Sequence, residues 1–153
     1  VFGTFTVTMV ITTPSVSPSS WPPVVASGTQ GSGTAIYVYN QSASLVGIVA
    51  YDGANRVFAL SLPLSTKVVI SVTKYYTGMM AFANTGAPIY VTGASIRDIS
   101  SSPNTQTYIG ACYDASNANT SLRIHEVRLW QRLLSKSELD TLHASLMTKW
   151  AIP

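Results

Sequence analysis

Apolar and polar positions alternate along the chain in short runs. The first run places apolar side chains at Phe5, Val7, Met9 and Ile11, with threonine at most of the positions between them. A spacing of two predicts a half-buried strand, here with one apolar face and one polar face. Similar runs, separated by Gly, Pro, Ser and Asn turns, predict further strands at 24–27, 34–40, 45–51, 56–62, 67–73, 79–84, 89–92, 107–112 and from 121 onward. Short strands at this spacing predict an all-β, antiparallel sandwich or jelly roll.

The last residues predict one amphipathic α-helix. Ser135 followed by Glu138 matches a capping box, in which each side chain accepts a hydrogen bond from the other residue's backbone N–H. The predicted apolar stripe of this helix is Leu139, Leu142, Leu146 and Trp150. His143 lies off that stripe, so we expect it to be solvated.

The strand before the helix changes the face on which its apolar residues lie. Leu122 and Ile124 occupy alternate positions, and Val127 and Leu129 then occupy the opposite set. A change of parity near His125 predicts either a β-bulge or a strand that is buried on both faces.

This strand and helix carry a recognisable residue pattern. The pattern consists of Ile124, Glu126, Val127, Trp130, Arg132, Leu134, Ser135, Glu138, Leu139, Leu142, Leu146, Lys149 and Trp150. It resembles the carboxy-terminal signature of laminin-G-like domains, which belong to the concanavalin A-like lectin/glucanase superfamily. A hairpin at 80–88 resembles another part of that family. The resemblance implies one concanavalin A-like jelly roll over residues 1–153, with a single C-terminal helix.

Laminin-G-like domains normally begin with a further strand upstream of the one predicted at 5–11. Only four residues precede that strand here. Either the further strand is absent from the sequence, or a neighbouring chain fills an open edge by strand addition. We favour strand addition, which makes other protein subunits the expected partners.

Composition narrows the setting of the domain. Only 10% of the 153 residues are charged, against about a quarter in ordinary soluble domains. A surface this poor in charge suits a secreted protein or a subunit that is largely covered inside an assembly. No apolar run reaches the ~18 residues of a membrane span, and a net charge of +3 is too small to indicate nucleic acid. The lone Cys112 is expected to be a buried small hydrophobe.

The basic residues are densest near the C-terminus. Arg123, Arg128, Arg132 and Lys136 lie close together in the sequence. A solvated face is the favoured interpretation of this cluster, and an anionic partner is the alternative.

The acidic residues argue against an enzyme. They are Asp52, Asp98, Asp114, Glu126, Glu138 and Asp140. Glycoside hydrolysis needs two carboxyl groups that flank one bond, but Glu138 is assigned to the helix cap and Glu126 has no acidic neighbour on its strand. His125 beside Glu126 is interpreted as a structural pair rather than an acid–base dyad, because strand neighbours point to opposite faces. Two histidines and one cysteine are too few for a zinc site.

Two sets of residues are candidates for ligand binding. Aromatic side chains in or beside predicted loops could stack on sugars or on a protein partner: Trp21, Tyr75, Tyr76, Tyr108 and Tyr113. Trp130 and Trp150 are instead expected in packing. Many laminin-G-like domains bind calcium at the rim, and the resemblance offers Asp52 with Asn55, and Asp114 with Asn117 and Asn119. Each loop supplies a single carboxylate, so ordinary turn chemistry is favoured over a calcium site.

The sequence therefore predicts a non-enzymatic structural and recognition module on the exterior of a large assembly. Such an assembly would be a virus or phage particle or a cell-surface structure, and the domain would be extracellular or on the virion surface. The alternative is a secreted carbohydrate-binding lectin domain, with calcium as the one candidate cofactor.

Overall fold

The computed structural model describes residues 4–16, 23–27, 34–40, 42–52, 55–75, 78–92, 107–110 and 122–153. The elements are β1 (Phe5–Thr12), β2 (Pro23–Ser27), β3 (Thr34–Asn40), β4 (Leu45–Asp52), β5 (Asn55–Pro63), β6 (Lys67–Tyr75), β7 (Gly78–Ala83), β8 (Ile89–Thr92), β9 (Thr107–Ile109), β10 (Arg123–Trp130) and α1 (Lys136–Lys149). Each predicted strand is found, and its described ends agree to within two residues, except that β9 ends at Ile109 where the prediction extended to residue 112. Cys112 lies outside the described residues.

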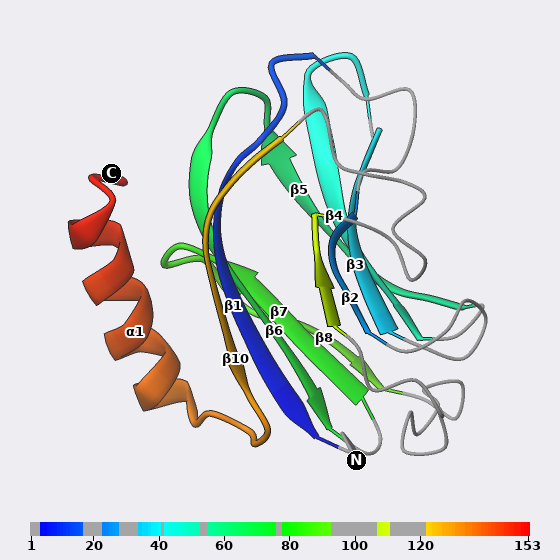
Figure 1. Cartoon of the computed structure of the whole chain (residues 1–153), viewed down its shortest axis with the longest axis vertical. Coiled ribbons are helices and arrows are strands. Elements are labelled where there is room, and N and C mark those ends of the chain that lie inside the picture. The colour runs from blue at the N-terminus through cyan, green and yellow to red at the C-terminus, as the bar shows by residue number, and fades with distance from the viewer. Residues whose placement is uncertain are drawn as a thin grey trace.

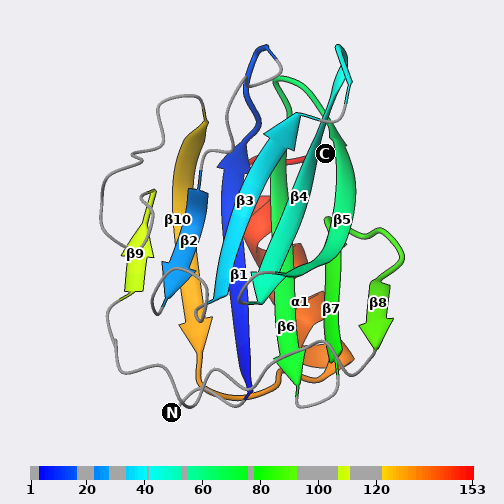
Figure 2. The same ribbon diagram turned by 90° about the vertical axis from the view of Figure 1, so that its right-hand side faces the viewer.

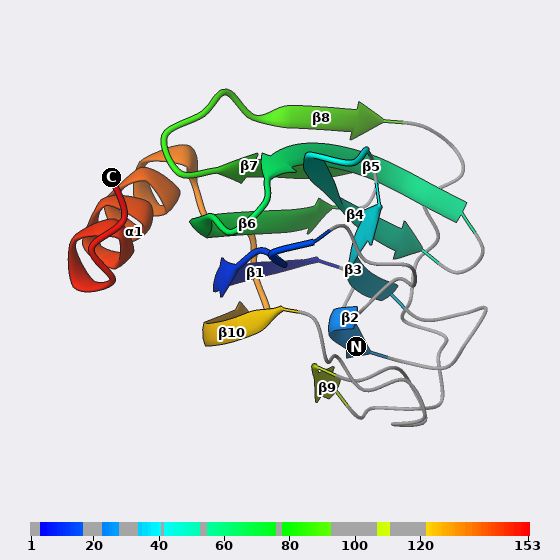
Figure 3. The same cartoon turned by 90° about the horizontal axis from the view of Figure 1, so that it is seen from above.

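The strands form two five-stranded antiparallel sheets. Sheet A has the order β10-β1-β6-β7-β8, and sheet B has the order β5-β4-β3-β2-β9. The two sheets face each other, and α1 lies on the outer face of sheet A, so the molecule has three layers (Figures 1 and 3). Viewed through sheet B, the helix is behind sheet A (Figure 2). The predicted antiparallel sandwich with one C-terminal helix is confirmed.

The main core lies between the two sheets. The predicted apolar face of β1 contributes Phe5, Val7, Met9 and Ile11, and β6 contributes Val68, Ile70 and Val72. Sheet B contributes Val24 and Val25 from β2 and Leu62 from β5. The two sheets therefore remove these apolar side chains from water together, which is the main favourable term in folding.

The polar face of β1 is also buried, which the sequence did not predict. Thr6 is 0% exposed and Thr8 is 1% exposed, because α1 and the segment leading to it cover this side of sheet A. The Thr6 hydroxyl donates to the Arg132 carbonyl (3.0 Å) and accepts from the Leu134 N–H (3.1 Å). The prediction of a half-buried strand was therefore wrong for β1. Its buried threonines are hydrogen-bonded to Thr73 and Ser71 of β6 and to the backbone, under a covering layer.

The predicted β-bulge is present in β10. In its pairing with β1, Val10 lies opposite Glu126 and Ile11 lies opposite Ile124, which leaves His125 as the extra residue. β1 is paired on both sides, by β10 and by β6. Among the described strands, the sheet edges are β10, β8, β5 and β9, and strand addition at one of them stays a prediction.

Hydrogen bonds fix both ends of α1. The predicted capping box is confirmed: the Glu138 N–H donates to the Ser135 hydroxyl (3.3 Å), and the Ser135 N–H donates to the Glu138 carboxylate (2.7 Å). Within the described residues, no helix has both the length and the apolar character that a membrane crossing requires.

The C-terminal end of α1 turns back through a left-handed residue. Ala151 has φ 50°, and the Ile152 N–H donates to the Met147 carbonyl (2.9 Å), which is the hydrogen bond of a Schellman motif. This turn places the Ile152 side chain in a buried cluster with Val10, Val69 and Leu146. The chain end is thereby anchored to sheet A.

Replacing Ala151 by glycine is expected to stabilise the protein by about 0.5–1 kcal/mol. Glycine removes the steric cost of the left-handed conformation, and its greater conformational entropy in the unfolded state offsets only part of that gain. Ala144 lies exposed in the middle of the same helix, so Ala144→Gly should destabilise by about 1 kcal/mol. Chemical denaturation of both variants measures the two shifts. A loss of stability in Ala151→Gly would contradict the assigned helix end.

Candidate functional site: a cleft between β10 and α1

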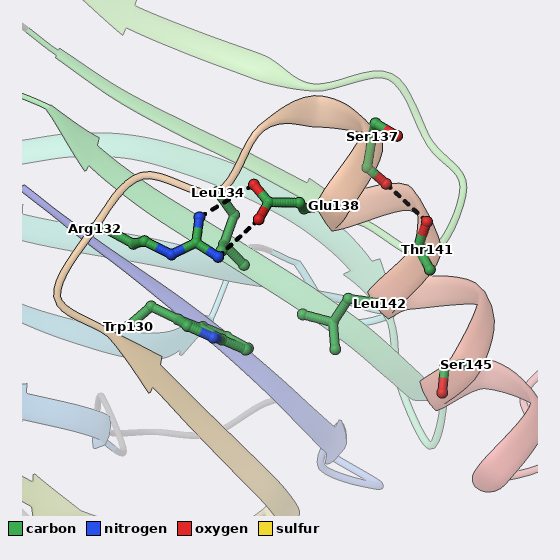
Figure 4. Close-up of a pocket in the computed structure, with 8 residues that line it drawn as sticks. All are labelled: Trp130, Arg132, Leu134, Ser137, Glu138, Thr141, Leu142 and Ser145. Atoms are coloured by element: carbon green, nitrogen blue, oxygen red, sulfur yellow. Dashed lines mark hydrogen bonds and ion pairs between the residues drawn. The ribbon is translucent and has the colours of Figure 1, made fainter.

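A cleft of about 440 Å³ opens between the end of β10 and the first half of α1 (Figure 4). Its floor is made of Trp130, Leu134 and Leu142. Trp130 and Leu142 are partly buried and pack against a cluster that contains Leu134, Phe82 and Leu139. In the close-up, Leu142 points toward the Trp130 ring. Trp130 is therefore both a packing residue, as predicted, and a surface of the cleft.

One rim of the cleft is a row of hydroxyl groups. Ser137, Thr141 and Ser145 follow each other at a spacing of four on α1 and line the cleft, because residues four apart lie on one helix face. The Thr141 hydroxyl donates to the Ser137 carbonyl (2.9 Å), so its oxygen still has room to accept. The side-chain hydroxyls of Ser137 and Ser145 are exposed and have no hydrogen-bond partner among the described residues.

An ion pair joins the segment after β10 to the start of α1 at another part of the rim (Figure 4). The Arg132 guanidinium donates to both carboxylate oxygens of Glu138 (2.7 and 3.2 Å). Arg132, followed by the Ser135 backbone and side chain, lowers the pKa of Glu138 to about 2. Glu138 is therefore ionised near neutral pH and cannot supply a proton as a general acid there. The cleft therefore combines an apolar floor, against which the face of a ring can pack, with hydroxyl and charged groups at its rim that can donate and accept hydrogen bonds.

His143 is buried under α1, so its predicted exposure to solvent was wrong. Its side chain is 1% exposed. The buried face of the helix runs through Leu139, His143 and Leu146, with a spacing of four and three, while Leu142 lies at the flank of that face. The imidazole stacks on the Phe82 ring, with the ring centres 4.3 Å apart.

Both ring nitrogens of His143 are hydrogen-bonded. Nδ1 lies 2.7 Å from the Asn84 carbonyl, and Nε2 lies 2.7 Å from the Ser71 hydroxyl, which itself lies 2.7 Å from the Thr8 hydroxyl. A carbonyl can only accept, so Nδ1 must carry a hydrogen. In the neutral ring Nε2 then accepts from Ser71, and Ser71 accepts from Thr8. This chain of donors joins β1, β6, the β7–β8 turn and α1.

His125 and Glu126 both reach toward the C-terminal end of α1. The His125 ring lies 5.1 Å from the Trp150 ring, and Nε2 lies 2.8 Å from the Thr12 hydroxyl. Glu126 accepts from the Trp150 indole N–H and the Lys149 ammonium, each at 2.8 Å. The expectation that these neighbours point to opposite faces was wrong, because the bulge at His125 breaks the alternation.

Glu126 is a structural anion. Arg128 donates to its second oxygen (2.7 Å), and the hydrogen bonds from Lys149 and Trp150 are the largest causes that lower the pKa of Glu126 to about 2. The Trp150 contact confirms the predicted structural role of that tryptophan. Glu126 therefore ties the last turn of α1 to the edge strand β10.

The basic cluster is largely neutralised by acids. Arg128 pairs with Glu126, Arg132 with Glu138, and Lys136 with Asp140. These pairs favour the interpretation as a solvated face over an anionic partner.

Most of the predicted binding residues lie where side chains are not described. Tyr75, at the end of β6, is partly buried against the cluster under the cleft floor. Tyr108 lies in β9, and Asp52 and Asn55 are paired at the adjoining ends of β4 and β5; only their backbones are described. Trp21, Tyr76, Tyr113, Asp114, Asn117 and Asn119 lie outside the described residues. Within the described part of the chain, no three His, Cys, Asp or Glu residues lie close enough to hold a metal ion.

No protein-family model matches the chain, and a search of curated proteins finds no match either. Among solved structures, the chain is similar to the CBM40 of Ruminococcus gnavus IT-sialidase, with a TM-score of 0.66 and 15% identity over 93% of this chain and 83% of that chain. It is also similar to a SAP-like pentraxin from Limulus polyphemus (TM-score 0.68, 14% identity, 93% of this chain and 70% of that one).

A third similar structure is the binding domain of botulinum neurotoxin serotype D, with a TM-score of 0.69 and 9% identity. The alignment covers 96% of this chain but only 37% of that one. At these identities the likeness shows the fold, which is the jelly-roll, concanavalin A-like β-sandwich of lectin-like domains. Membership of the laminin-G-like family in particular stays a prediction.

Replacing Glu126 by glutamine is expected to destabilise the protein by about 1–2 kcal/mol. The charge-assisted hydrogen bonds from Arg128, Lys149 and Trp150 weaken, and the new amide group faces a donor. Asp140→Asn removes a carboxylate from the exposed pair with Lys136 on α1 and should lower the stability by less than about 0.5 kcal/mol. Thermal unfolding at pH 7.5 compares the two variants. Equal effects would show that Glu126 does not anchor α1.

Proposed function

We propose that the protein is a non-catalytic glycan-recognition module that holds a sugar ring in the cleft between β10 and α1. The observation that carries this proposal is the combination of the Trp130 floor with the hydroxyl row Ser137, Thr141 and Ser145 in one cleft. An indole face and an aliphatic side chain suit the C–H face of a sugar ring, and the surrounding rim offers hydrogen-bond partners to its hydroxyl groups. A volume near 440 Å³ falls within the range of small-molecule sites.

Proteins of the same fold support a glycan as the ligand class. The CBM40 structures include complexes with alpha2,3 and alpha2,6 sialyllactose. Another similar structure is from botulinum neurotoxin type C, whose cell entry is described as dependent on interaction with two ganglioside molecules. These statements concern those proteins; for this chain they make a glycan the first ligand class to test, in an extracellular setting.

The described acids support binding without hydrolysis. Glu138 is paired with Arg132 and capped onto α1, and Glu126 is held at the other end of the helix by three donors. Neither carboxyl group is a proton donor near neutral pH, because both have pKa values of about 2. A general acid paired with a nucleophile, which glycoside hydrolysis needs, is not formed by these residues.

A glycan array followed by calorimetry tests the site. We expect Ser145→Trp to fill the cleft and weaken binding by at least about tenfold, which corresponds to the loss of roughly 1.4 kcal/mol of contacts. Ala144→Trp is the matched control, because Ala144 is exposed on the neighbouring helix face and does not line the cleft. Both measurements are made with calcium and with a chelator, which tests the calcium expectation.

Three outcomes separate the alternatives. Loss of binding in Ser145→Trp alone supports the cleft. Binding that survives Ser145→Trp but is lost in Tyr76→Ala or Trp21→Ala moves the site to the predicted loop aromatics. An array without any hit contradicts glycan recognition.

We propose, as a second function, that the domain contacts other protein subunits at an edge of sheet A. Two edge strands of this sheet carry exposed apolar side chains: Leu129 in β10 is 45% exposed, and Tyr90 in β8 is 60% exposed. A sheet edge of this kind is a template for strand addition. The low charge of the chain, 10% of residues, favours the same use.

Light scattering over a range of protein concentrations tests this second function. We expect association that Leu129→Lys weakens by at least tenfold, since a buried unpaired ammonium is costly and a lysine on an edge strand discourages pairing. The control Leu133→Lys changes an exposed leucine beyond the end of β10. A wild-type protein that stays monomeric at every concentration contradicts the role as an assembly subunit.

A further inference from the structure

The two histidines of the chain both lie at the interface between α1 and sheet A. His143 sits under the middle of the helix, against Phe82 and Ser71. His125 sits under its C-terminal end, against Trp150 and Thr12. Histidine is the side chain that ordinarily changes charge between pH 5 and 8. The interface therefore holds all of the histidine charge that the protein can gain on acidification.

A proton on His143 disrupts the hydrogen-bond chain that holds it. With Nδ1 donating to the Asn84 carbonyl, the neutral ring accepts at Nε2 from Ser71. Protonated Nε2 must donate instead, so Ser71 has to turn its hydrogen toward Thr8, and Thr8 then has to find another acceptor. Around the buried ring, the charged side chains that act on His143 are Asp140 and Lys136 of α1 itself. The side chains of the sheet that contact the ring or continue its hydrogen-bond chain are Ser71, Thr8 and Phe82, which carry no charge.

A proton on His125 adds charge to a site that is already basic. The groups around it are Lys67 of β6, Arg123 and Glu126 of β10, and Lys149 of α1. Glu126 is fully used by Lys149, Trp150 and Arg128. Burial, followed by the charges of Lys67 and Arg123, lowers the pKa of His125.

The sheet face under α1 is partly polar. Four of its buried side chains are hydroxyl groups, Thr6, Thr8, Ser71 and Thr73, and four are apolar, Val10, Val69, Met80 and Phe82. Hydroxyl groups can exchange their mutual hydrogen bonds for bonds to water, so uncovering this face costs less than uncovering an equal apolar area. The main core between the sheets is a separate cluster that contains no histidine and no residue of α1.

We propose that acidification through the range in which histidine takes up a proton releases α1 from sheet A while the two-sheet sandwich stays folded. Release dismantles the cleft, because Ser137, Thr141 and Ser145 leave with the helix. Helix α1 is thus an acid-sensitive cover of sheet A, and its release does not depend on which ligand binds in the cleft.

Linkage gives the direction and size of the effect. Burial lowers the pKa of His143 below its ordinary 6.5, and the Asn84 carbonyl and Asp140 offset only part of this. Since the released state binds the proton more readily, docking is strongest above pH 6.5 and weakens as the pH falls below it. The equilibrium constant for release rises by at most about tenfold per pH unit for each histidine. Between pH 6.5 and 5 the rise is at most about 16-fold for one histidine, because a released ring with the ordinary pKa of 6.5 is already half-protonated at pH 6.5. Glu126 and Glu138, with pKa values of about 2, keep their charge over this interval.

Hydrogen exchange followed by mass spectrometry at pH 7.5, 6.5, 5.5 and 5.0 tests the release. After correction for intrinsic exchange, we expect the opening constant of residues 136–149 to rise at least tenfold from pH 6.5 to 5.0, while β1 and β6 keep their protection. His143→Gln, whose amide can still donate to the Asn84 carbonyl, should abolish most of the rise, and the double variant with His125→Asn should abolish it fully.

Each contrary outcome overturns the proposal. It fails if the opening constant of α1 in the wild-type protein does not change with pH, or if β1 and β6 open together with α1. It also fails if the double variant responds to acid as the wild type does. Should the variants not fold, NMR titration of the wild-type histidines decides instead: His143 must take up its proton below pH 6.5, in the same interval in which the α1 amides lose protection.

Discussion

Helix α1 is held on sheet A by a chain of hydrogen bonds that runs from the Thr8 hydroxyl through Ser71 to the buried ring of His143, and from there to the Asn84 carbonyl. Every donor in this chain has one acceptor only if the imidazole is neutral and carries its hydrogen on Nδ1. A buried polar network is favourable when fully satisfied and costly when one member is not. The polar middle of the interface between α1 and sheet A is fully satisfied in that one protonation state.

The interface under the helix has a polar middle and two apolar ends. At one end Leu146 and Ile152 pack on Val10 and Val69, and at the other Leu139 and Leu134 pack on Met80 and Phe82. The apolar ends supply most of the burial energy, and the polar middle fixes the register of the helix against the sheet. The cleft follows from this register, because it is formed between Trp130 of β10 and the hydroxyl row of α1.

Local patterns in the sequence predicted the elements well. The capping box of Ser135 and Glu138 and the β-bulge at His125 are encoded by residues near one another in the chain, and both were found. The burial of Thr6 and Thr8 was not predictable from alternation, since threonine suits a solvent face as well as a face under another layer. His143 was predicted to be exposed because the local sequence does not show that it has polar partners far away in the chain. These partners are the Ser71 hydroxyl and the Asn84 carbonyl. The cleft was missed because Trp130 and Ser145 line it together only after the turn between β10 and α1 folds the helix back. Among the predicted binding residues, Tyr75 packs against the cluster under the floor of the cleft. The side chains of the others are not described.

In this β-sandwich, the cleft that we propose for recognition is formed in part by a helix that a buried histidine holds on sheet A. The hydrogen bonds of that histidine require a neutral His143 with its hydrogen on Nδ1. Nitrogen-15 NMR of the imidazole side chains at pH 7.5, which distinguishes the two neutral tautomers and the cation, tests this most directly. The structure predicts a neutral His143 ring with Nδ1 protonated and Nε2 bare. A ring with its hydrogen on Nε2, or a cationic ring at this pH, would contradict the hydrogen-bond chain on which the docking of α1 rests.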